Sequence, residues 1–222
     1  MEETSPQIRP LIFDLTLTEQ KKEWTKFFSN NPDIELIDTR KGQLVEWIKI
    51  KNPGKNFSPE NVNRLKQEWK NNRSWEEMGL VVYYPWLKKG VFLLGKDEFI
   101  ELRTSRNQYK ITPSEQNTLA QKKIGIIGLS VGSAIALTLA SERCCGEIRL
   151  ADFDEIELSN LNRIQTSLIN LGKNKAVVAA RAISEIDPFI KVKIFEKGIT
   201  EENMEEFLCG GGKLDLLFDE CD

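Results

Sequence analysis

A glycine-containing turn is the first place in this sequence where residue types and spacing could do chemistry. Gly128-Leu129-Ser130-Val131-Gly132 lies between an apolar run and a helical pattern. Glycines at such a turn let the backbone approach phosphate groups, and the following helix offers free N–H groups and the positive end of its dipole. The same letters fit G-x-S-x-G, in which Ser130 would attack an acyl group. Gly128, Ser130 and Gly132 are therefore candidates for phosphate binding or for acyl transfer.

The composition favours phosphate binding over a serine nucleophile. The chain contains no histidine, so Ser130 would lack an imidazole base. The motif also opens the alternating part of the sequence, whereas a nucleophile elbow usually follows several strands. We therefore interpret Ser130 as a small turn residue or helix cap.

Acidic, amide and basic residues follow the next expected strand. Asp152 lies 24 residues after Gly128, where a carboxylate in Rossmann folds accepts hydrogen bonds from ribose. Up to this point an NAD-dependent oxidoreductase fits equally well. The polar loop that follows does not suit a dehydrogenase. It contains Asp154 and closes with Ser-Asn-Leu-Asn-Arg at 159–163, before Gly172 and Lys175. An arginine fork and a lysine charge suit a triphosphate.

The elements that must position these residues alternate between strand and helix. Strands are expected at 124–128, 147–152, 192–195 and 214–219, and helices at 131–142, 175–186 and 201–209. This alternation implies parallel strands joined by helical crossovers. Residues 106–222 are therefore predicted to form an α/β, Rossmann-like unit with a mainly parallel sheet.

Residues 1–105 differ in composition from the rest of the chain. All five tryptophans lie in the first 86 residues, and the pattern predicts a small α+β unit. Its expected elements are helices at 18–29 and 59–70, a strand at 34–37, and a hairpin of 79–85 with 91–94 whose turn contains Gly90. We interpret the tryptophans as packing residues rather than a ligand cage. The boundary between the units is expected near Arg103–Pro113, and the sequence reveals no role for the first unit.

Taken together, these motifs resemble the adenylating domain of the ubiquitin-activating superfamily, of the ThiF/MoeB/HesA type. That family has D-x-D, then S-N-L-x-R-Q, then G-x-x-K. Here Asp152 and Asp154, the 159–163 loop and Gly172–Lys175 occupy those places. Arg103-Thr104-Ser105-Arg106-Asn107 resembles the family's R-x-x-R-Q element, so the resemblance covers residues 103–222.

The resemblance implies specific roles, which we carry forward as expectations. Gly128, Ser130, Gly132, Asp152 and Asp154 would form the ATP site, with Asp152 on the ribose. The phosphates would be held by a set of three side chains, Asn160, Arg163 and Lys175. Arg106 would reach into a partner's site across a homodimer, and Asp222 would position Mg²⁺.

The implied reaction is attack of a carboxylate on the α-phosphate of ATP, giving an acyl-adenylate and pyrophosphate. The carboxylate could be the tail of a ubiquitin-like or sulfur-carrier protein. Such a reaction depends on positioning and charge stabilisation, so it needs no histidine. Two alternatives stay open. One is a catalytically decayed nucleotide- or partner-binding module. The glycine loop favours this alternative, because it is one residue shorter than the family's usual G-x-G-G-x-G. The other is an NAD-dependent oxidoreductase, which does not explain the 159–163 loop.

Charge and patterning exclude several other classes. Residues 1–110 carry 19 lysines and arginines against 16 aspartates and glutamates, and residues 111–222 carry 12 against 18. Neither part has the dense basic cluster of a nucleic-acid binder. No apolar run is long enough for a membrane span, and the N-terminus lacks a secretory signal, so we expect a cytoplasmic protein.

The four cysteines lack C-x-x-C spacing, which argues against a zinc site. Because the sequence stops at the expected metal ligand, Asp222, we expect it to be part of a longer protein.

Overall fold

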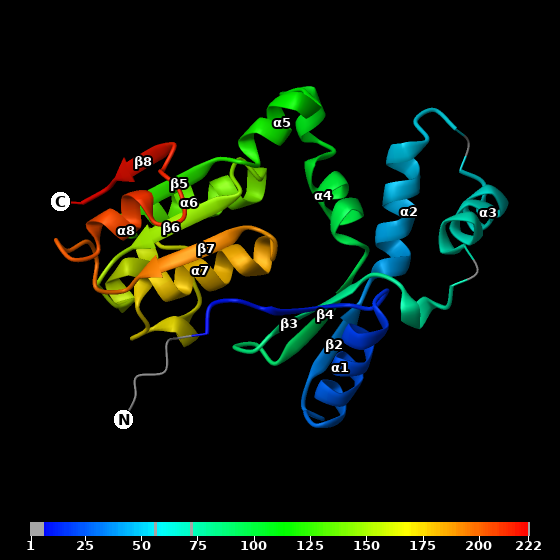
Figure 1. Ribbon diagram of the computed structural model, residues 1–222, viewed down its shortest axis with the longest axis horizontal. Coiled ribbons are helices and arrows are strands. Elements are labelled where there is room, and N and C mark those ends of the chain that lie inside the picture. The colour runs from blue at the N-terminus through cyan, green and yellow to red at the C-terminus, as the bar shows by residue number, and fades with distance from the viewer. Residues whose placement is uncertain (1–6, 56, 72, 222) are drawn as a thin grey trace. The chain divides into compact units, whose positions relative to one another are not determined.

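The computed structural model describes residues 7–55, 57–71 and 73–221. The described chain forms two compact units (Figure 1). We call Pro10–Arg106 the tryptophan unit, and residues 7–9 with 107–221 the Rossmann unit. Within the described ranges, no helix has both the length and the apolar character needed to cross a membrane.

The Rossmann unit is built on four parallel strands in the order β7-β6-β5-β8. Ile126 in β5 pairs with Leu150 in β6 on one side and with Phe218 in β8 on the other. Strands β6 and β7 are added in turn on one side of β5, whereas β8 is added on the other side of β5, as in doubly wound folds. The predicted α/β, Rossmann-like fold is confirmed. The strands are β5 (Lys123–Ile127), β6 (Glu147–Ala151), β7 (Lys191–Phe195) and β8 (Leu216–Asp219).

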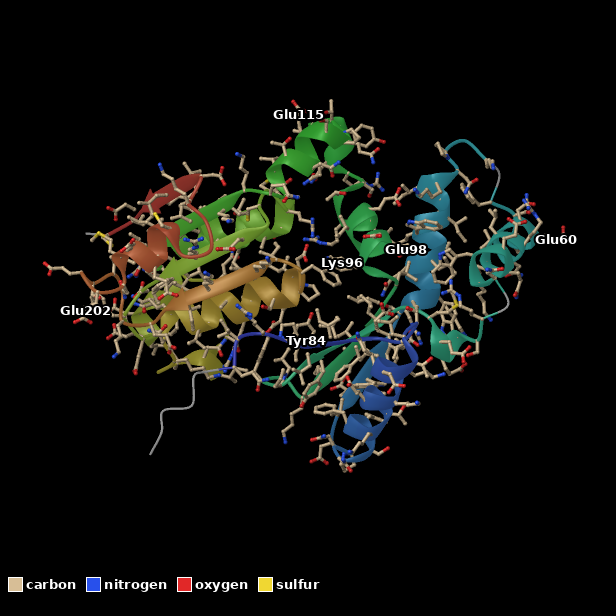
Figure 2. All side chains as sticks on the ribbon, in the orientation of Figure 1. Glu60, Tyr84, Lys96, Glu98, Glu115 and Glu202 are labelled. Atoms are coloured by element: carbon tan, nitrogen blue, oxygen red, sulfur yellow. The ribbon has the colours of Figure 1, made fainter. Side chains whose placement is uncertain are left out.

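Four α-helices connect or precede these strands. Their bounds are α5 (Pro113–Leu119), α6 (Gly132–Glu142), α7 (Lys175–Ile186) and α8 (Met204–Cys209). Short 3-10 turns are η2 (Asn107–Tyr109), η3 (Leu158–Asn162) and η4 (Leu168–Asn170). Helix α5 begins with a capping box, in which the side chains of Thr112 and Glu115 each accept a hydrogen bond from the other's backbone N–H. Glu115 is labelled in Figure 2.

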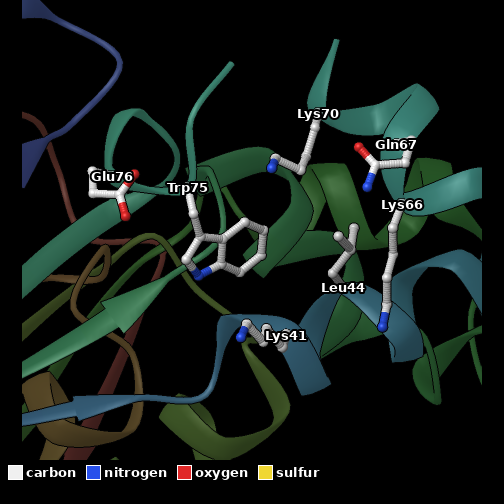
Figure 3. Close-up of a pocket in the computed structure, with 7 residues that line it drawn as sticks. All are labelled: Lys41, Leu44, Lys66, Gln67, Lys70, Trp75 and Glu76. Atoms are coloured by element: carbon white, nitrogen blue, oxygen red, sulfur yellow. The ribbon is translucent and has the colours of Figure 1, made fainter. Parts of the chain in front are cut away.

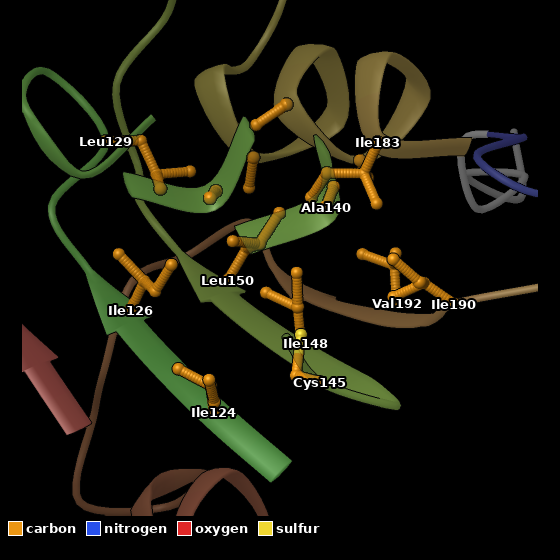
Figure 4. Packing of buried hydrophobic residues seen from close by; sticks show 14 residues of the cluster. Ile124, Ile126, Leu129, Ala140, Cys145, Ile148, Leu150, Ile183, Ile190 and Val192 are labelled. Atoms are coloured by element: carbon orange, nitrogen blue, oxygen red, sulfur yellow. The ribbon is translucent and has the colours of Figure 1, made fainter. Parts of the chain in front are cut away.

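The core of this unit lies between the sheet and the pair α6 and α7. Ile148 and Leu150 of β6 are fully buried there and pack with Ala140 of α6 and Ile183 of α7 (Figure 4). Because successive strand residues point to opposite faces, Arg149 between them points to the other face. Strand β6 alternates polar and apolar residues, yet all five are buried, because Glu147 and Arg149 pair with each other on the second face.

Arg149 is a fully buried cation that joins the sheet to α8. Its guanidinium donates to the Glu147 carboxylate (2.8 Å) and to the carbonyls of Phe207 (2.6 Å) and Gly212 (2.6 Å). A buried charge is tolerated only when it is paired and hydrogen-bonded. Arg149 therefore fixes the end of α8 and the glycine-rich loop against the back of the sheet.

The tryptophan unit contains a mixed sheet in the order β1-β3-β4-β2. Strand β3 pairs antiparallel with both β1 and β4, whereas β2 runs parallel to β4. The strands are β1 (Leu11–Asp14), β2 (Glu35–Asp38), β3 (Leu80–Tyr84) and β4 (Lys89–Leu93). The helices are α1 (Thr18–Ser29), α2 (Arg40–Lys51), α3 (Pro59–Lys70), α4 (Lys96–Thr104) and the 3-10 turn η1 (Trp75–Glu77).

The hairpin prediction needs one correction in this unit. Gly90 lies inside β4 rather than in the turn, and the turn is formed by residues 85–88 with Lys88 at a positive φ of 53°. A Cβ on Gly90 would come within 2.8 Å of the Leu36 side chain on the neighbouring strand. The glycine is therefore needed for close strand packing, not for a turn conformation.

A buried arginine also organises this unit. Arg40 forms a two-point ion pair with Asp38 and donates to the carbonyls of Trp75 and Met78. Its guanidinium also lies over the Trp75 ring, 5.1 Å from the centroid. The pair lowers the pKa of the Asp38 carboxyl below its usual value, chiefly through the hydrogen bond from Arg40. These contacts anchor the start of α2 and η1 in one place.

Candidate nucleotide-binding site

A pocket of about 360 Å³ opens at the carboxyl ends of the Rossmann-unit strands. Open parallel sheets bind ligands at this edge, where the strand order reverses. The lining comes from the ends of β5, β6 and β8 and from the segment after β7. Its residues are Ile127, Gly128, Ser130, Ala151, Asp152, Phe153, Asp154, Lys175, Gly198, Ile199, Glu220 and Cys221.

The glycine turn follows the C-terminal end of β5, where backbone geometry and Asp152 hold it in place. Gly128 adopts φ of 80°, and a Cβ there would come within 2.5 Å of the Glu220 carbonyl oxygen. A side chain at this position would therefore be both strained and obstructed. The buried Asp152 carboxylate accepts hydrogen bonds from the N–H groups of Leu129 (2.6 Å) and Asp154 (2.8 Å). Asp152 thus ties the turn to the end of β6.

Lys175 is the cation inside this pocket. Its side chain is only 6% exposed, and its ammonium donates to the Asp154 carboxylate (2.7 Å) and to the Ser130 hydroxyl (3.2 Å). An ammonium has three N–H donors, so one remains for a ligand beyond the contacts of the described residues. Lys175 is also the first residue of α7, where the helix dipole adds positive potential.

Asn174 fixes the position of Lys175. Its side-chain oxygen caps α7 by accepting from the N–H groups of Ala176 and Val177. Its amide nitrogen donates to the carbonyls of Asp152 (3.0 Å) and Glu196 (3.2 Å). One side chain therefore connects the helix to the segments after β6 and β7. The sequence placed Asn174 in the matched G-x-x-K motif, but its cap and two donor contacts were missed.

The structure brings five of the predicted site residues to this pocket: Gly128, Ser130, Asp152, Asp154 and Lys175. Of the other five, the four that lie within the described residues do not line it. Gly132 is buried at the first turn of α6. Asn160 is buried in η3, where its side-chain oxygen accepts from the Glu157 N–H. Arg163 is exposed and donates to the Asn162 side chain (3.0 Å), and Arg106 is exposed in the turn after α4.

The expected metal ligand, Asp222, lies outside the described residues. In the described ranges, no group of three or more histidine, cysteine, aspartate or glutamate residues could hold a metal ion. Assignment of Mg²⁺ to Asp222 therefore stays a prediction.

An aromatic side chain at the pocket was not recognised from the sequence. Phe153, between the two aspartates of the D-x-D motif, lines the pocket and is 74% exposed. A large exposed aromatic beside polar groups is typical of a binding surface. Its place in the sequence between Asp152 and Asp154, which both line the pocket, was the available signal.

Two known proteins are similar to this chain in sequence. Over 147 residues, the chain is 47% identical to the Mycobacterium tuberculosis protein MT1398, covering 66% of this chain and 20% of that protein. It is 34% identical over 98 residues to ubiquitin-like modifier-activating enzyme 5 of Aedes aegypti, covering 43% of this chain and 24% of that enzyme.

A solved structure matches at the level of fold. The E. coli tRNA N6-threonylcarbamoyladenosine dehydratase, crystallised with ATP, superposes with a TM-score of 0.50 at 26% identity, covering 55% of this chain and 50% of that one. Its complex with AMP gives a TM-score of 0.51 at 27% identity, with 55% and 49% covered. The chain thus spans between a fifth and a half of the length of these relatives.

The family assignment covers the Rossmann unit. The model of the ThiF family matches residues 104–222, which is more than half of the 222 residues. The resemblance drawn from the Asp152, Asn160 and Lys175 motifs is thereby confirmed, and the chain belongs to the ThiF family.

Proposed function

We propose that the Rossmann unit binds ATP and takes part in the adenylation of a carboxylate. The observation that carries this proposal is the pocket beside Lys175, with one ammonium N–H left for a ligand. The glycine turn, the buried Asp152 and the cation lie on one edge of the sheet. The E. coli dehydratase crystallised with ATP and with AMP supports the choice of an adenine nucleotide.

The residues present fit such a ligand. A volume of about 360 Å³ is in the range of small-molecule sites. Lys175 can hold a phosphate oxygen, and the backbone at Gly128 can approach one closely. Each Asp152 oxygen already accepts one backbone N–H, and each has a second lone pair for a ribose hydroxyl. ATP would supply the electrophilic phosphorus and a pyrophosphate leaving group, while these side chains bind and orient it.

The acceptor and the assembly belong to the same proposal. We propose that the carboxylate is the tail of a ubiquitin-like or sulfur-carrier protein, which the name of the Aedes relative supports. We also propose a homodimer in which Arg106 serves the partner's site. A monomer by light scattering at high protein concentration would contradict the dimer.

A matched pair of lysines tests the ATP site. Lys175→Ala removes the pocket cation, whereas Lys173→Ala removes a nearby ammonium that donates to Asn170 and does not line the pocket. We expect Lys175→Ala to weaken ATP binding about tenfold or more, because a charge-assisted contact to phosphate is worth about 1.5–3 kcal/mol. Lys173→Ala should bind like the parent. Calorimetric titration with ATP and MgCl₂ measures both.

Ligand choice distinguishes this proposal from an oxidoreductase. In thermal-shift titrations we expect ATP with Mg²⁺ to raise the melting temperature more than NAD or NADP does, by mass action on the folded state. Selective stabilisation by NAD would overturn the adenylation proposal. ATP binding without ATP–pyrophosphate exchange, in the presence of a carrier-protein tail, would instead favour a non-catalytic nucleotide-binding module.

A further inference from the structure

A second pocket, of about 410 Å³, lies within the tryptophan unit between α2, α3 and η1. It is lined by Lys41, Leu44, Lys66, Gln67, Lys70, Trp75 and Glu76. We call it the lysine pocket. Figure 3 shows the three lysine side chains around it, with Leu44 and the Trp75 ring among them. All of its lining residues belong to this one unit.

The charge around the lysine pocket is unbalanced. Lys41, Lys66 and Lys70 have no carboxylate partner among the described residues, although eleven ion pairs occur elsewhere in them. Lys66 and Lys70 are one turn apart on α3 and half-buried, so their like charges repel each other. Without a ligand this arrangement is electrostatically unfavourable. An anion would remove that cost.

Glu76, the one acidic residue of the lining, does not neutralise these lysines. Hydrogen bonds from its own backbone N–H and from Ser74 lower the pKa of its carboxyl. It is therefore charged at neutral pH but directed to its own turn. One negative charge stands against three positive charges around the pocket.

The apolar part of the lining is packed against the core of the unit. Leu44 is 1% exposed and belongs to the core of the unit. The Trp75 ring is half-buried, with the Arg40 guanidinium 5.1 Å from its centroid and the Trp69 ring centroid 6.3 Å away. An indole beside cations offers a stacking surface for a planar ring next to an anion.

We propose that the lysine pocket binds a small phosphorylated ligand with a planar ring, of the nucleoside phosphate class. Lysines are effective point charges for phosphate, and the Trp75 ring provides the stacking face. This site is separate from the ATP site at Lys175, because its lining residues all come from the tryptophan unit. The proposal does not depend on the proposed adenylation.

The distribution of tryptophan gives a specific probe for this site. All five tryptophans, Trp24, Trp47, Trp69, Trp75 and Trp86, belong to the tryptophan unit, so tryptophan emission comes from that unit alone. We expect AMP, titrated into the full chain, to change this emission saturably. Unchanged emission at millimolar AMP would overturn the proposal.

Variants that remove lysine charges test whether AMP changes the emission by binding in the lysine pocket. We expect the double variant Lys66→Gln/Lys70→Gln to weaken the AMP response about tenfold or more. A matched control, Lys26→Gln/Lys49→Gln, removes two exposed lysines of the same unit that do not line the pocket, and should leave the response within about twofold. Equal weakening in both variants, or an unchanged response in the pocket variant, would place the ligand elsewhere and overturn the assignment.

A third variant tests the stacking ring. Trp75→Leu should weaken AMP binding but leave inorganic pyrophosphate binding unchanged, with emission followed from the remaining tryptophans. Equal loss for both ligands would contradict a role for the ring. A saturable response to hexaglutamate but not to AMP would show an acidic-peptide site and overturn the nucleoside phosphate class.

Discussion

Arg163 and Lys175 were predicted as phosphate-binding residues from two successive motifs of the same family, but they occupy different environments. Lys175 is almost completely buried beside Ser130 and Asp154. Arg163 is exposed and contacts the side chain of its neighbour Asn162. A role for Arg163 on phosphate therefore requires its long side chain to leave that contact.

The sequence-based prediction for Arg163 can be measured directly. Arg163→Ala should weaken ATP binding about tenfold, because a guanidinium on phosphate makes strong bidentate contacts. The free energy of unfolding without ligand should change by no more than about 0.5 kcal/mol, since the side chain is exposed. Arg163→Lys should restore only part of the affinity. Calorimetry on the three proteins in one buffer would contradict the assignment if the alanine variant binds like the parent.

Cys145 carries a pH-dependent prediction. Burial raises the pKa of its thiol from about 9 to about 12, so the folded chain keeps a proton that the unfolded chain loses. The free energy of unfolding should therefore fall as the pH rises above about 9. Cys145→Ala should reduce this fall, as measured by urea denaturation at several alkaline pH values. An identical pH dependence in the parent and Cys145→Ala would exclude Cys145 as its source.

At the scale of elements, Asn174 is the side chain that connects α7 to the sheet edge. Asn174→Ala should lower the free energy of unfolding by about 1–2 kcal/mol through loss of the helix cap. It should also weaken ATP binding, because Lys175 begins the same helix. Asn174→Asp keeps the capping oxygen but loses the donor to Asp152 and Glu196. It should regain stability more than ATP affinity. Urea denaturation and calorimetry would contradict this separation if both properties recovered together.

Elements with strong local signals could be predicted from the sequence. Helix α3 begins at Pro59 after the Ser58 cap, and α7 ends before Asp187-Pro188, as expected. Helix α2 was missed because Gly42 and its β-branched residues obscure a helical pattern that tertiary packing of Leu44 and Ile48 stabilises. Strand β1 and helix α4 were also missed.

In the candidate site, too, the parts with a local sequence signal could be predicted and the parts that depend on long-range contacts could not. Its backbone turn and acidic strand end follow from local spacing, so Gly128 and Asp152 could be placed in advance. The contribution of Glu220 and Cys221 depends on β8 pairing beside β5, a long-range contact without a local signal. The lysine pocket depends similarly on α2 packing against α3. Trp75, interpreted from the sequence as a packing residue, also lines that pocket.

At the scale of the whole molecule, the two units can be followed by different spectroscopic signals. The Rossmann unit has no tryptophan among residues 107–221, whereas both units contribute helix to circular dichroism. We expect ATP to shift the melting transition seen by circular dichroism more than the one seen by tryptophan emission, because the pocket at Lys175 is lined only by Rossmann-unit residues. Equal shifts in both signals would show that the units unfold together.

The short segment 7–9 has a consequence for the order in which the chain matures during synthesis. Ser184 of α7 donates to the Ile8 carbonyl, a contact between residues 176 positions apart, and Arg181 donates to Gln7. The tryptophan unit is one continuous stretch and can fold once its last residues have left the ribosome. Residues 7–9 must wait until α7 has been translated. Residues 7–9 are therefore synthesised before the tryptophan unit but form their contacts with α7 only after it.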